Sequence, residues 1–192
     1  MAKRSRPGRL RIVAGNWRSR LLEIAAVPGL RPTAERIRET LFNWLAPNIQ
    51  GARCLDLFAG TGALGLEALS RGAGTVVFVE KSAVAAKALR ANVALLEATG
   101  ADVRQADALE YLAQAGASPF DIVFLDPPFA ADMLEDLCRL LDETSLVENG
   151  SFVYLEDDRA RSPISLPENW TLLKSKTAGN VRYALAQVND GD

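Results

Sequence analysis

Two short stretches near the start of the chain alternate between apolar and polar positions, as the strands of a sheet do. Residues 9–14 and 17–24 are therefore predicted to form two strands, joined by a tight turn at Gly15–Asn16. Apolar side chains then recur with helical spacing, at positions 37, 41, 44 and 45. We expect an amphipathic helix here, with Thr33 as its N-cap and Pro47 as its limit.

From residue 52 onward, short apolar runs alternate with Ala/Leu-rich stretches of helical spacing. Strands are expected at Cys54–Phe58, Thr75–Val79, Asp102–Gln105, Ile122–Leu125, Ser151–Leu155, 170–176 and 181–188, and helices at 62–71, 82–98, 107–114 and 130–142. Strands that alternate with helices form a mostly parallel sheet covered on both faces. The connection 177–180 is too short for a crossover, so the last two strands should be antiparallel to each other. The predicted organisation is an N-terminal extension (1–50) and an α/β body (51–192).

Composition excludes several classes of function. The chain has 192 residues, 48% of them hydrophobic and 24% charged, as globular proteins do. It contains no His, which rules out imidazole bases and ligands, and its two cysteines cannot form a disulfide scaffold or a Cys-rich metal site. We expect no metal. No apolar run approaches the roughly 18 residues of a membrane helix and no signal peptide is evident, so a cytoplasmic protein without a membrane partner is expected.

Charge is distributed unevenly, although the net charge is only -2. Residues 1–38 carry ten Lys/Arg and two acidic residues, whereas the rest of the chain has an acidic excess. This asymmetry indicates that the N-terminal extension binds a polyanion such as RNA. The candidate RNA-binding residues are Arg4, Arg6, Arg9, Arg11, Arg18, Arg31, Thr33, Arg36 and Lys176. The alternative is that these side chains only keep the surface solvated.

A glycine-rich turn follows the first strand of the predicted body. Gly60, Gly62 and Gly65 spell G-x-G-x-x-G, a pattern that lets the backbone approach a nucleotide closely. A dinucleotide site would receive a pyrophosphate directly after the strand, but Asp56 stands there and would repel it. An acidic residue beside a glycine turn suits a ligand that carries an ammonium group.

Two more acidic residues follow the next two strands. Glu80, twenty residues after Gly60, is placed to accept hydrogen bonds from ribose hydroxyls, and Asp107 from an adenine amino group. Together with Asp56, these acids fit a cationic end, a ribose and a base, which are the parts of S-adenosylmethionine. Each acid alone could instead be a helix cap or a solvated loop residue.

The fourth strand of the body is followed by Asp126-Pro127-Pro128-Phe129. An exocyclic amine of a base is a poor nucleophile because its lone pair is delocalised into the ring. The Asp126 carboxylate and the Pro127 carbonyl can each accept one N–H bond from such an amine, and the proline rings hold these acceptors rigidly. Phe129 offers a face on which an extruded base can stack. The alternative is a rigid turn after a buried strand.

These motifs together resemble class I S-adenosylmethionine-dependent methyltransferases that act on amino groups. More narrowly, the chain resembles the RsmD family, bacterial 16S rRNA guanine-N2 methyltransferases, nearly from end to end. The matching segments are Arg11–Arg18, Gly29–Thr33, Arg38–Leu45, the glycine loop, Asp126–Phe129 and Lys176–Gly179. Ala14 departs from the glycine expected in many relatives.

The resemblance implies a Rossmann-like fold of seven strands, one of them antiparallel, with helices on both faces and an N-terminal hairpin and helix. It implies S-adenosylmethionine as cofactor and 16S rRNA, within a small subunit or a late assembly particle, as partner of a monomeric enzyme. The cofactor contacts are then expected at Asp56, Phe58, Ala59, Gly60, Thr61, Gly62, Glu80, Lys81, Asp107 and Ala108, and catalysis at Asp126, Pro127, Pro128 and Phe129.

Three alternatives remain open at this point. The D-P-P-F element also occurs in methyltransferases that act on adenine or on a protein amide. The literal G-x-G-x-x-G could serve an oxidoreductase that binds a nicotinamide cofactor. A non-catalytic ribosome assembly factor could also be built on the same scaffold.

Overall fold

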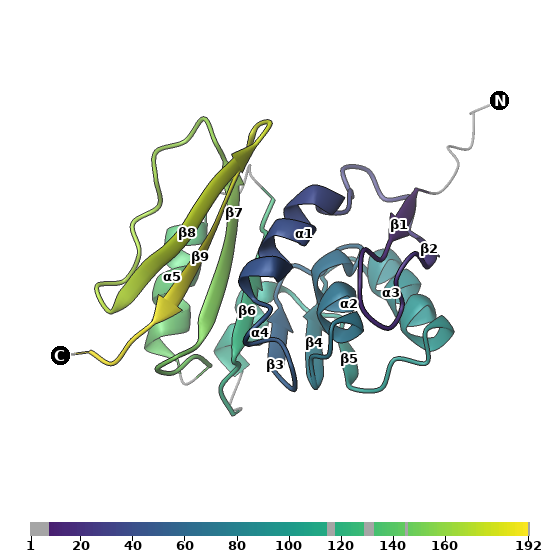
Figure 1. Ribbon diagram of the computed structural model, residues 1–192, viewed down its shortest axis with the longest axis horizontal. Helices are drawn as coiled ribbons and strands as arrows, with labels where there is room; N and C mark the ends of the chain where they lie inside the picture. The colour runs from purple at the N-terminus through teal and green to yellow at the C-terminus, as the bar shows by residue number, and fades with distance from the viewer. Residues whose placement is uncertain (1–7, 115–117, 129–132, 145, 192) are drawn as a thin grey trace.

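A computed structural model describes residues 8–191 except 115–117, 129–132 and 145. Its centre is a seven-stranded sheet in the order β5-β4-β3-β6-β7-β9-β8 (Figure 1). The strands are β3 (Arg53–Asp56), β4 (Thr75–Val79), β5 (Ala101–Arg104), β6 (Ile122–Leu125), β7 (Phe152–Asp158), β8 (Trp170–Ala178) and β9 (Val181–Val188). Strand β9 runs antiparallel to both of its neighbours, and the other adjacent pairs are parallel. The predicted mixed sheet with one antiparallel strand is confirmed.

Within the described residues, five helices cover the two faces of this sheet: α1 (Glu35–Trp44), α2 (Ala63–Ser70), α3 (Ala83–Leu95), α4 (Ala108–Gln114) and α5 (Leu134–Glu143). One hydrophobic cluster joins side chains of α1, α2 and α3 to Phe124, and a second joins α4 and α5 to Val123. Consecutive side chains of a strand point to opposite faces, so these clusters lie on the two sides of the sheet. Helices on both faces are therefore confirmed.

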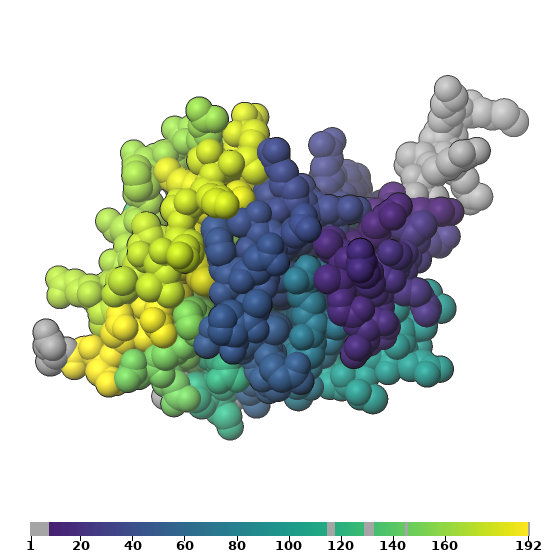
Figure 2. All heavy atoms as spheres, viewed as in Figure 1, coloured from purple at the N-terminus to yellow at the C-terminus, as the bar shows by residue number. Residues whose placement is uncertain are grey.

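The N-terminal hairpin is confirmed, but its predicted tight turn is wrong. Strands β1 (Arg9–Arg11) and β2 (Leu21–Glu23) pair antiparallel and are much shorter than expected, because residues 12–20 form a long loop. The Asn16 amide of this loop donates to the Ser70 carbonyl in α2 (2.7 Å) rather than across the hairpin. In Figure 2, residues 8–50 spread over one face of the molecule.

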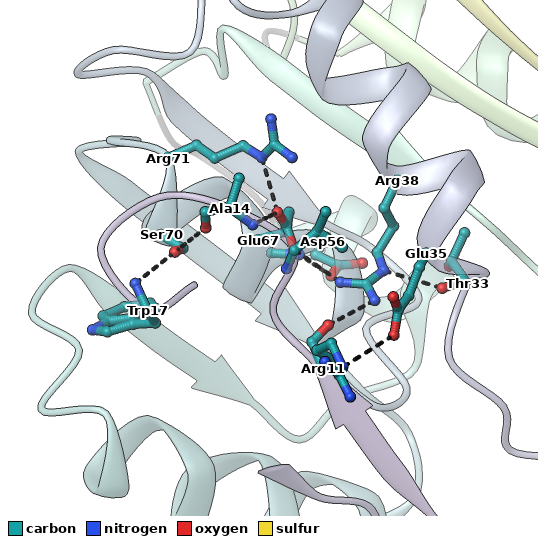
Figure 3. A network of polar contacts seen from close by, with 12 residues as sticks. Arg11, Ala14, Trp17, Thr33, Glu35, Arg38, Asp56, Glu67, Ser70 and Arg71 are labelled. Carbon is teal, nitrogen blue, oxygen red and sulfur yellow. Dashed lines mark hydrogen bonds and ion pairs between the residues drawn. The ribbon is translucent and has the colours of Figure 1, made fainter. Parts of the chain in front are cut away.

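A buried carboxylate anchors this loop to the body (Figure 3). Glu67 of α2 has no exposed surface and accepts the backbone amides of Val13 (2.9 Å) and Ala14 (3.0 Å). Its oxygens also bind the guanidinium groups of Arg38 (2.8 Å) and Arg71 (2.9 Å). Glu67 thus ties the hairpin loop and α1 to α2.

Arg38 completes the same network from α1. Its side chain is 1% exposed, and besides Glu67 it donates to the backbone carbonyls of Arg11 (2.8 Å) and Thr33 (3.1 Å). Each of the three nitrogens of the guanidinium group donates to a different segment of the chain. Although it is charged, Arg38 is one of the most buried residues of α1.

The predicted N-cap of the first long helix is also wrong. The residue that precedes α1 is Ala34, and no side chain caps the helix. The Thr33 hydroxyl instead donates to the Asp126 carboxylate at the end of β6 (3.3 Å). The remaining boundary differences are small, except that α5 begins at Leu134 and β7 continues to Asp158.

Gly15 gives a direct test of how the hairpin loop docks on α2. Its φ is +81°, and a Cβ there would lie 1.8 Å from the Ser70 carbonyl oxygen. We expect Gly15→Ala to lower the free energy of unfolding by roughly 2–4 kcal/mol in urea titrations, because the loop must pull away from α2. Gly29 has a similar φ of +80° with open space around it, so Gly29→Ala is a control for backbone strain alone. Equal losses in the two variants would contradict this account of the loop.

Candidate active site

A cavity of about 1070 Å³ opens at the carboxyl ends of β3, β4, β5 and β6. In sheets of this kind, ligands bind at this edge. The predicted residues that line it are Arg31, Thr33, Arg36, Asp56, Phe58, Ala59, Gly60, Thr61, Glu80, Lys81, Asp107, Ala108, Asp126, Pro127 and Pro128. The structure therefore brings the glycine loop and the Asp-Pro-Pro turn to one hollow. Gly62 does not line it, and Phe129 falls outside the described residues.

The glycine loop is shaped by hydrogen bonds to the next strand. The Gly60 amide donates to Glu80 Oε2 (2.8 Å), and the Ala59 amide donates to the Val79 carbonyl (2.9 Å). Gly62 precedes α2 in a left-handed conformation (φ +78°), and a Cβ there would lie 2.4 Å from a methyl group of Leu89. Glycine is thus required at position 62 for shape, not for lining the cavity.

Asp56 ends β3 at the floor of the cavity. Its side chain is almost fully buried, and it accepts the Gly65 amide (3.0 Å) in the first turn of α2. Burial, together with the charges of Asp126 and Glu80, raises the pKa of Asp56 to about 7. The hydrogen bond from the Gly65 amide acts in the opposite direction and lowers this pKa. A cationic ligand group nearby would favour the ionised form.

The other two acids also have backbone partners. Glu80 Oε1 accepts the Ser82 amide (2.6 Å), which leaves further lone pairs on both of its oxygens. Asp107 accepts the Leu109 amide (3.0 Å) as a helix cap does, and it pairs with Lys81 (3.0 Å). The Lys81 bond lowers the pKa of Asp107. Asp107 therefore caps a helix, which was the alternative interpretation of this residue, and it also lines the cavity.

This arrangement fits S-adenosylmethionine in three respects. Carboxylates stand at the ends of three successive strands, where an ammonium group, a ribose and an amino group of a base would meet them. Gly60 lines the cavity without a side chain, so a ligand can approach the backbone of the glycine loop closely. The cavity volume also matches a ligand of this size.

Asp126 lies where β6 meets the same cavity. Burial raises its pKa to about 6, and the Thr33 hydrogen bond opposes the shift. Pro127 beside it is buried and Pro128 is exposed. Pro127 removes one backbone N–H and fixes the chain direction, so the Asp126 carboxylate is held at a defined place.

Comparisons with known proteins identify the family. A family model described as Conserved hypothetical protein 95 matches residues 10–187. Ribosomal RNA small subunit methyltransferase D of Escherichia coli (strain K12) is 46% identical over 180 residues, which is 94% of this chain and 90% of that protein. The chain belongs to this family, the RsmD family.

Solved structures agree with this assignment. An Escherichia coli protein, yhhF, named as a methyltransferase, is 42% identical and superposes with a TM-score of 0.88 over 95% of this chain and 99% of its own. A methyltransferase structure in complex with SAH is only 15% identical, with a TM-score of 0.74 over 98% of this chain and 58% of its own. The second similarity shows the fold, and the Rossmann-like methyltransferase fold expected for an RsmD family member is confirmed.

Five of the basic residues predicted to bind RNA lie in two places in this RsmD family member. Arg9, Arg11 and Arg18 are exposed on the hairpin, and Arg31 and Arg36 are exposed at the cavity. Lys176 of β8 lies away from both, with its ammonium 6.0 Å from the centroid of the Trp44 ring. Arg4 and Arg6 fall outside the described residues.

Sequence analysis missed one ionisable residue of the cavity, Glu156 of β7. The strand was expected to stop at Leu155, so Glu156 lay outside the expected strand. One pattern in the sequence could have revealed Glu156: an acidic residue directly follows the apolar run of a strand that neighbours the Asp126 strand. Apolar residues also line the cavity, among them Leu30, Ile37, Met133, Ala178 and Val181.

Two further properties concern only the part of the chain that the structure describes. None of its helices is both long and apolar enough to cross a membrane. No group of three or more His, Cys, Asp or Glu side chains in it is arranged to hold a metal ion. Both cysteines, Cys54 in β3 and Cys138 in α5, are buried.

Proposed function

We propose that this protein transfers a methyl group from S-adenosylmethionine to the exocyclic N2 amine of one guanine in 16S rRNA. Its substrate is the small ribosomal subunit or a late assembly particle, and the enzyme acts as a monomer in the cytoplasm. The observation that carries the proposal is that the Asp126-Pro127 turn and the glycine loop share one cavity. The small subunit rRNA methyltransferases among its relatives support RNA as the substrate.

Different residues of the site have different roles in the proposed reaction. When bound, S-adenosylmethionine supplies an electrophilic methyl group on a sulfonium sulfur that leaves as a neutral thioether. The carboxylate of Asp126 and the carbonyl of Pro127 each accept one N–H of the guanine amine, which directs the nitrogen lone pair toward the methyl group. As the N–C bond forms and the S–C bond breaks, the nitrogen becomes positive, and its extra proton passes to Asp126 or to water. No histidine or metal is required for these steps.

Charge on the N-terminal part of the chain supports the RNA partner. The exposed Arg9, Arg11 and Arg18 of the hairpin can contact RNA phosphates at a distance from the cavity. Arg31 and Arg36 can contact RNA phosphates beside the cavity. A folded ribosomal particle supplies the shape that a small basic extension of residues 1–50 can recognise. Phe129 is proposed to stack on the extruded base.

The test is transfer of a labelled methyl group to small subunits purified from cells that lack this gene, followed by digestion and nucleoside analysis. N2-methylguanosine is expected as the labelled product, with transfer to free rRNA weaker than transfer to the particle. The Asp126→Asn protein is the matched control and should give little label. Labelled N6-methyladenosine or a methylated protein amide would reject the proposed substrate. Normal ribosome function in cells that carry an inactive Asp126 variant would favour a non-catalytic assembly factor.

A further inference from the structure

Glu156 and Asp126 are placed side by side by the sheet itself. Strands β6 and β7 are parallel, and Leu125 is paired with Leu155, so the next residues, Asp126 and Glu156, stand opposite each other. Neighbouring strands are about 4.8 Å apart, and both side chains project from the same face. Both residues line the cavity, which confirms that the two carboxyl groups meet the same space.

A tyrosine fixes the Glu156 side chain. Glu156 is 6% exposed, and the buried Tyr154 hydroxyl donates to its Oε2 (2.7 Å). No described residue donates to its other oxygen, Oε1. Tyr154 itself is held by the edge of the Phe124 ring, with the two centroids 6.4 Å apart. The Glu156 carboxyl is therefore held in place while one of its oxygens remains available toward the hollow.

The charged and titratable groups around Glu156 come from four directions. Asp126 faces it from β6, and Tyr183 is its partner in β9. Arg31 and Arg36 line the cavity with it, and Glu135, Asp136 and Arg161 line a smaller hollow of about 620 Å³ on its other side. The neighbouring Asp157 points to the opposite face of the sheet, where it pairs with Arg182.

The carboxyl groups of Asp126 and Glu156 are buried side by side, so it is unfavourable for both to be ionised at once. Burial and, to a smaller extent, the Asp126 charge together raise the pKa of Glu156 to about 8, although the Tyr154 hydrogen bond lowers it. Asp126 is the more exposed of the two residues and accepts the Thr33 hydroxyl, so we expect its carboxyl group to ionise before that of Glu156. At neutral pH the two residues therefore share one negative charge, as closely spaced carboxyl pairs do.

We propose that Glu156 is a positioning residue for the methyl transfer and acts through Asp126: its uncharged carboxyl, fixed by Tyr154, leaves Asp126 as the single negative group that the amine meets. This inference rests on the proposed function. When Glu156 ionises, the second charge repels the Asp126 carboxylate and displaces it from the amine, so the rate falls. The wild-type enzyme then has a bell-shaped pH profile, although it contains no histidine.

The experiment measures kcat from pH 5 to pH 10 for wild type, Glu156→Gln and the control Glu148→Gln. The wild-type rate is expected to rise as Asp126 ionises and to fall as Glu156 ionises. Glutamine is uncharged and cannot ionise, so Glu156→Gln should keep kcat at pH 7 within about three-fold of wild type and move the descending limb up by at least about one pH unit. The exposed Glu148 lies in the turn before β7, and Glu148→Gln should retain the wild-type profile.

Carboxyl-carbon NMR of the protein without substrate gives a second measurement that does not depend on activity. Asp126 and Glu156 should titrate as a coupled pair in wild type, and Asp126 should titrate in one step in Glu156→Gln. Tyr154→Phe removes a bond that favours the ionised carboxylate, so it should move the descending limb and the Glu156 titration to higher pH.

The inference is overturned if the descending limb of Glu156→Gln or of Tyr154→Phe stays at the wild-type pH. It is equally overturned if the two carboxyl groups titrate independently in wild type. Failure of the proposed function looks different: guanine would receive no methyl group at any pH, and the NMR titrations would still show whether the pair is coupled. Should Glu156→Gln not fold, the Tyr154→Phe profile decides the outcome.

Discussion

Asp126→Asn is expected to lower kcat for methyl transfer roughly 10²- to 10³-fold, the usual effect of removing one preorganised polar partner of a reacting group. The amide has the same size as the carboxylate but carries no negative charge, so it cannot stabilise the positive charge that develops on the amine. The affinity for S-adenosylhomocysteine should change by less than about three-fold, because the groups proposed to hold the cofactor belong to other strands. Single-turnover kinetics and calorimetry measure the two quantities separately.

The Thr33 hydrogen bond provides a graded comparison for this prediction. Thr33→Val removes the hydroxyl that donates to Asp126 but leaves the carboxylate in place, so kcat should fall by only about ten-fold or less. In wild type, kcat should decline as the pH drops through about 6, because protonation of Asp126 removes the acceptor. Equal losses of kcat and cofactor affinity in Asp126→Asn would show that the residue is structural and would contradict its proposed role.

Arg38→Met is expected to lower the free energy of unfolding by about 3–5 kcal/mol, the cost of breaking a buried ion pair by removing one partner. Methionine fills a similar volume but leaves two backbone carbonyls, those of Arg11 and Thr33, without their donors. It also leaves the buried Glu67 carboxylate with Arg71 as its remaining cationic partner. Urea titration of the purified variant measures the change.

Arg139 is the matched control, since it pairs with Asp136 (2.8 Å) at the surface. Its side chain is 63% exposed, and Arg139→Met should cost less than about 1 kcal/mol. If Arg38→Met proved no more destabilising than Arg139→Met, the network would not be what holds α1 and the hairpin loop to α2.

The order and type of the main elements could be predicted from sequence because the hydrophobic period changes clearly between strands and helices. The glycine loop and the Asp126 turn could be located for the same reason, since each directly follows an apolar strand. The long hairpin loop could not be predicted, because its amides bind Glu67 and Ser70, which lie more than 50 positions away in the chain. Local alternation at 9–14 and 17–24 carries no information about such distant partners.

Buried charges were the other limit of sequence analysis. Glu67 stands in an otherwise apolar helix, every residue of which is buried, so a partner for it was required, but the sequence alone did not show that the partner is Arg38. Glu156 was hidden because its strand continues three residues beyond the expected end. In both cases the position of the charge depends on which elements become neighbours in space.

Calorimetric titration with S-adenosylhomocysteine, run in parallel with a nicotinamide dinucleotide, tests most directly whether this cavity is a methyl-donor site. The account predicts saturable binding of one S-adenosylhomocysteine per chain and no measurable heat with the dinucleotide. Heat with the dinucleotide and none with S-adenosylhomocysteine would contradict it.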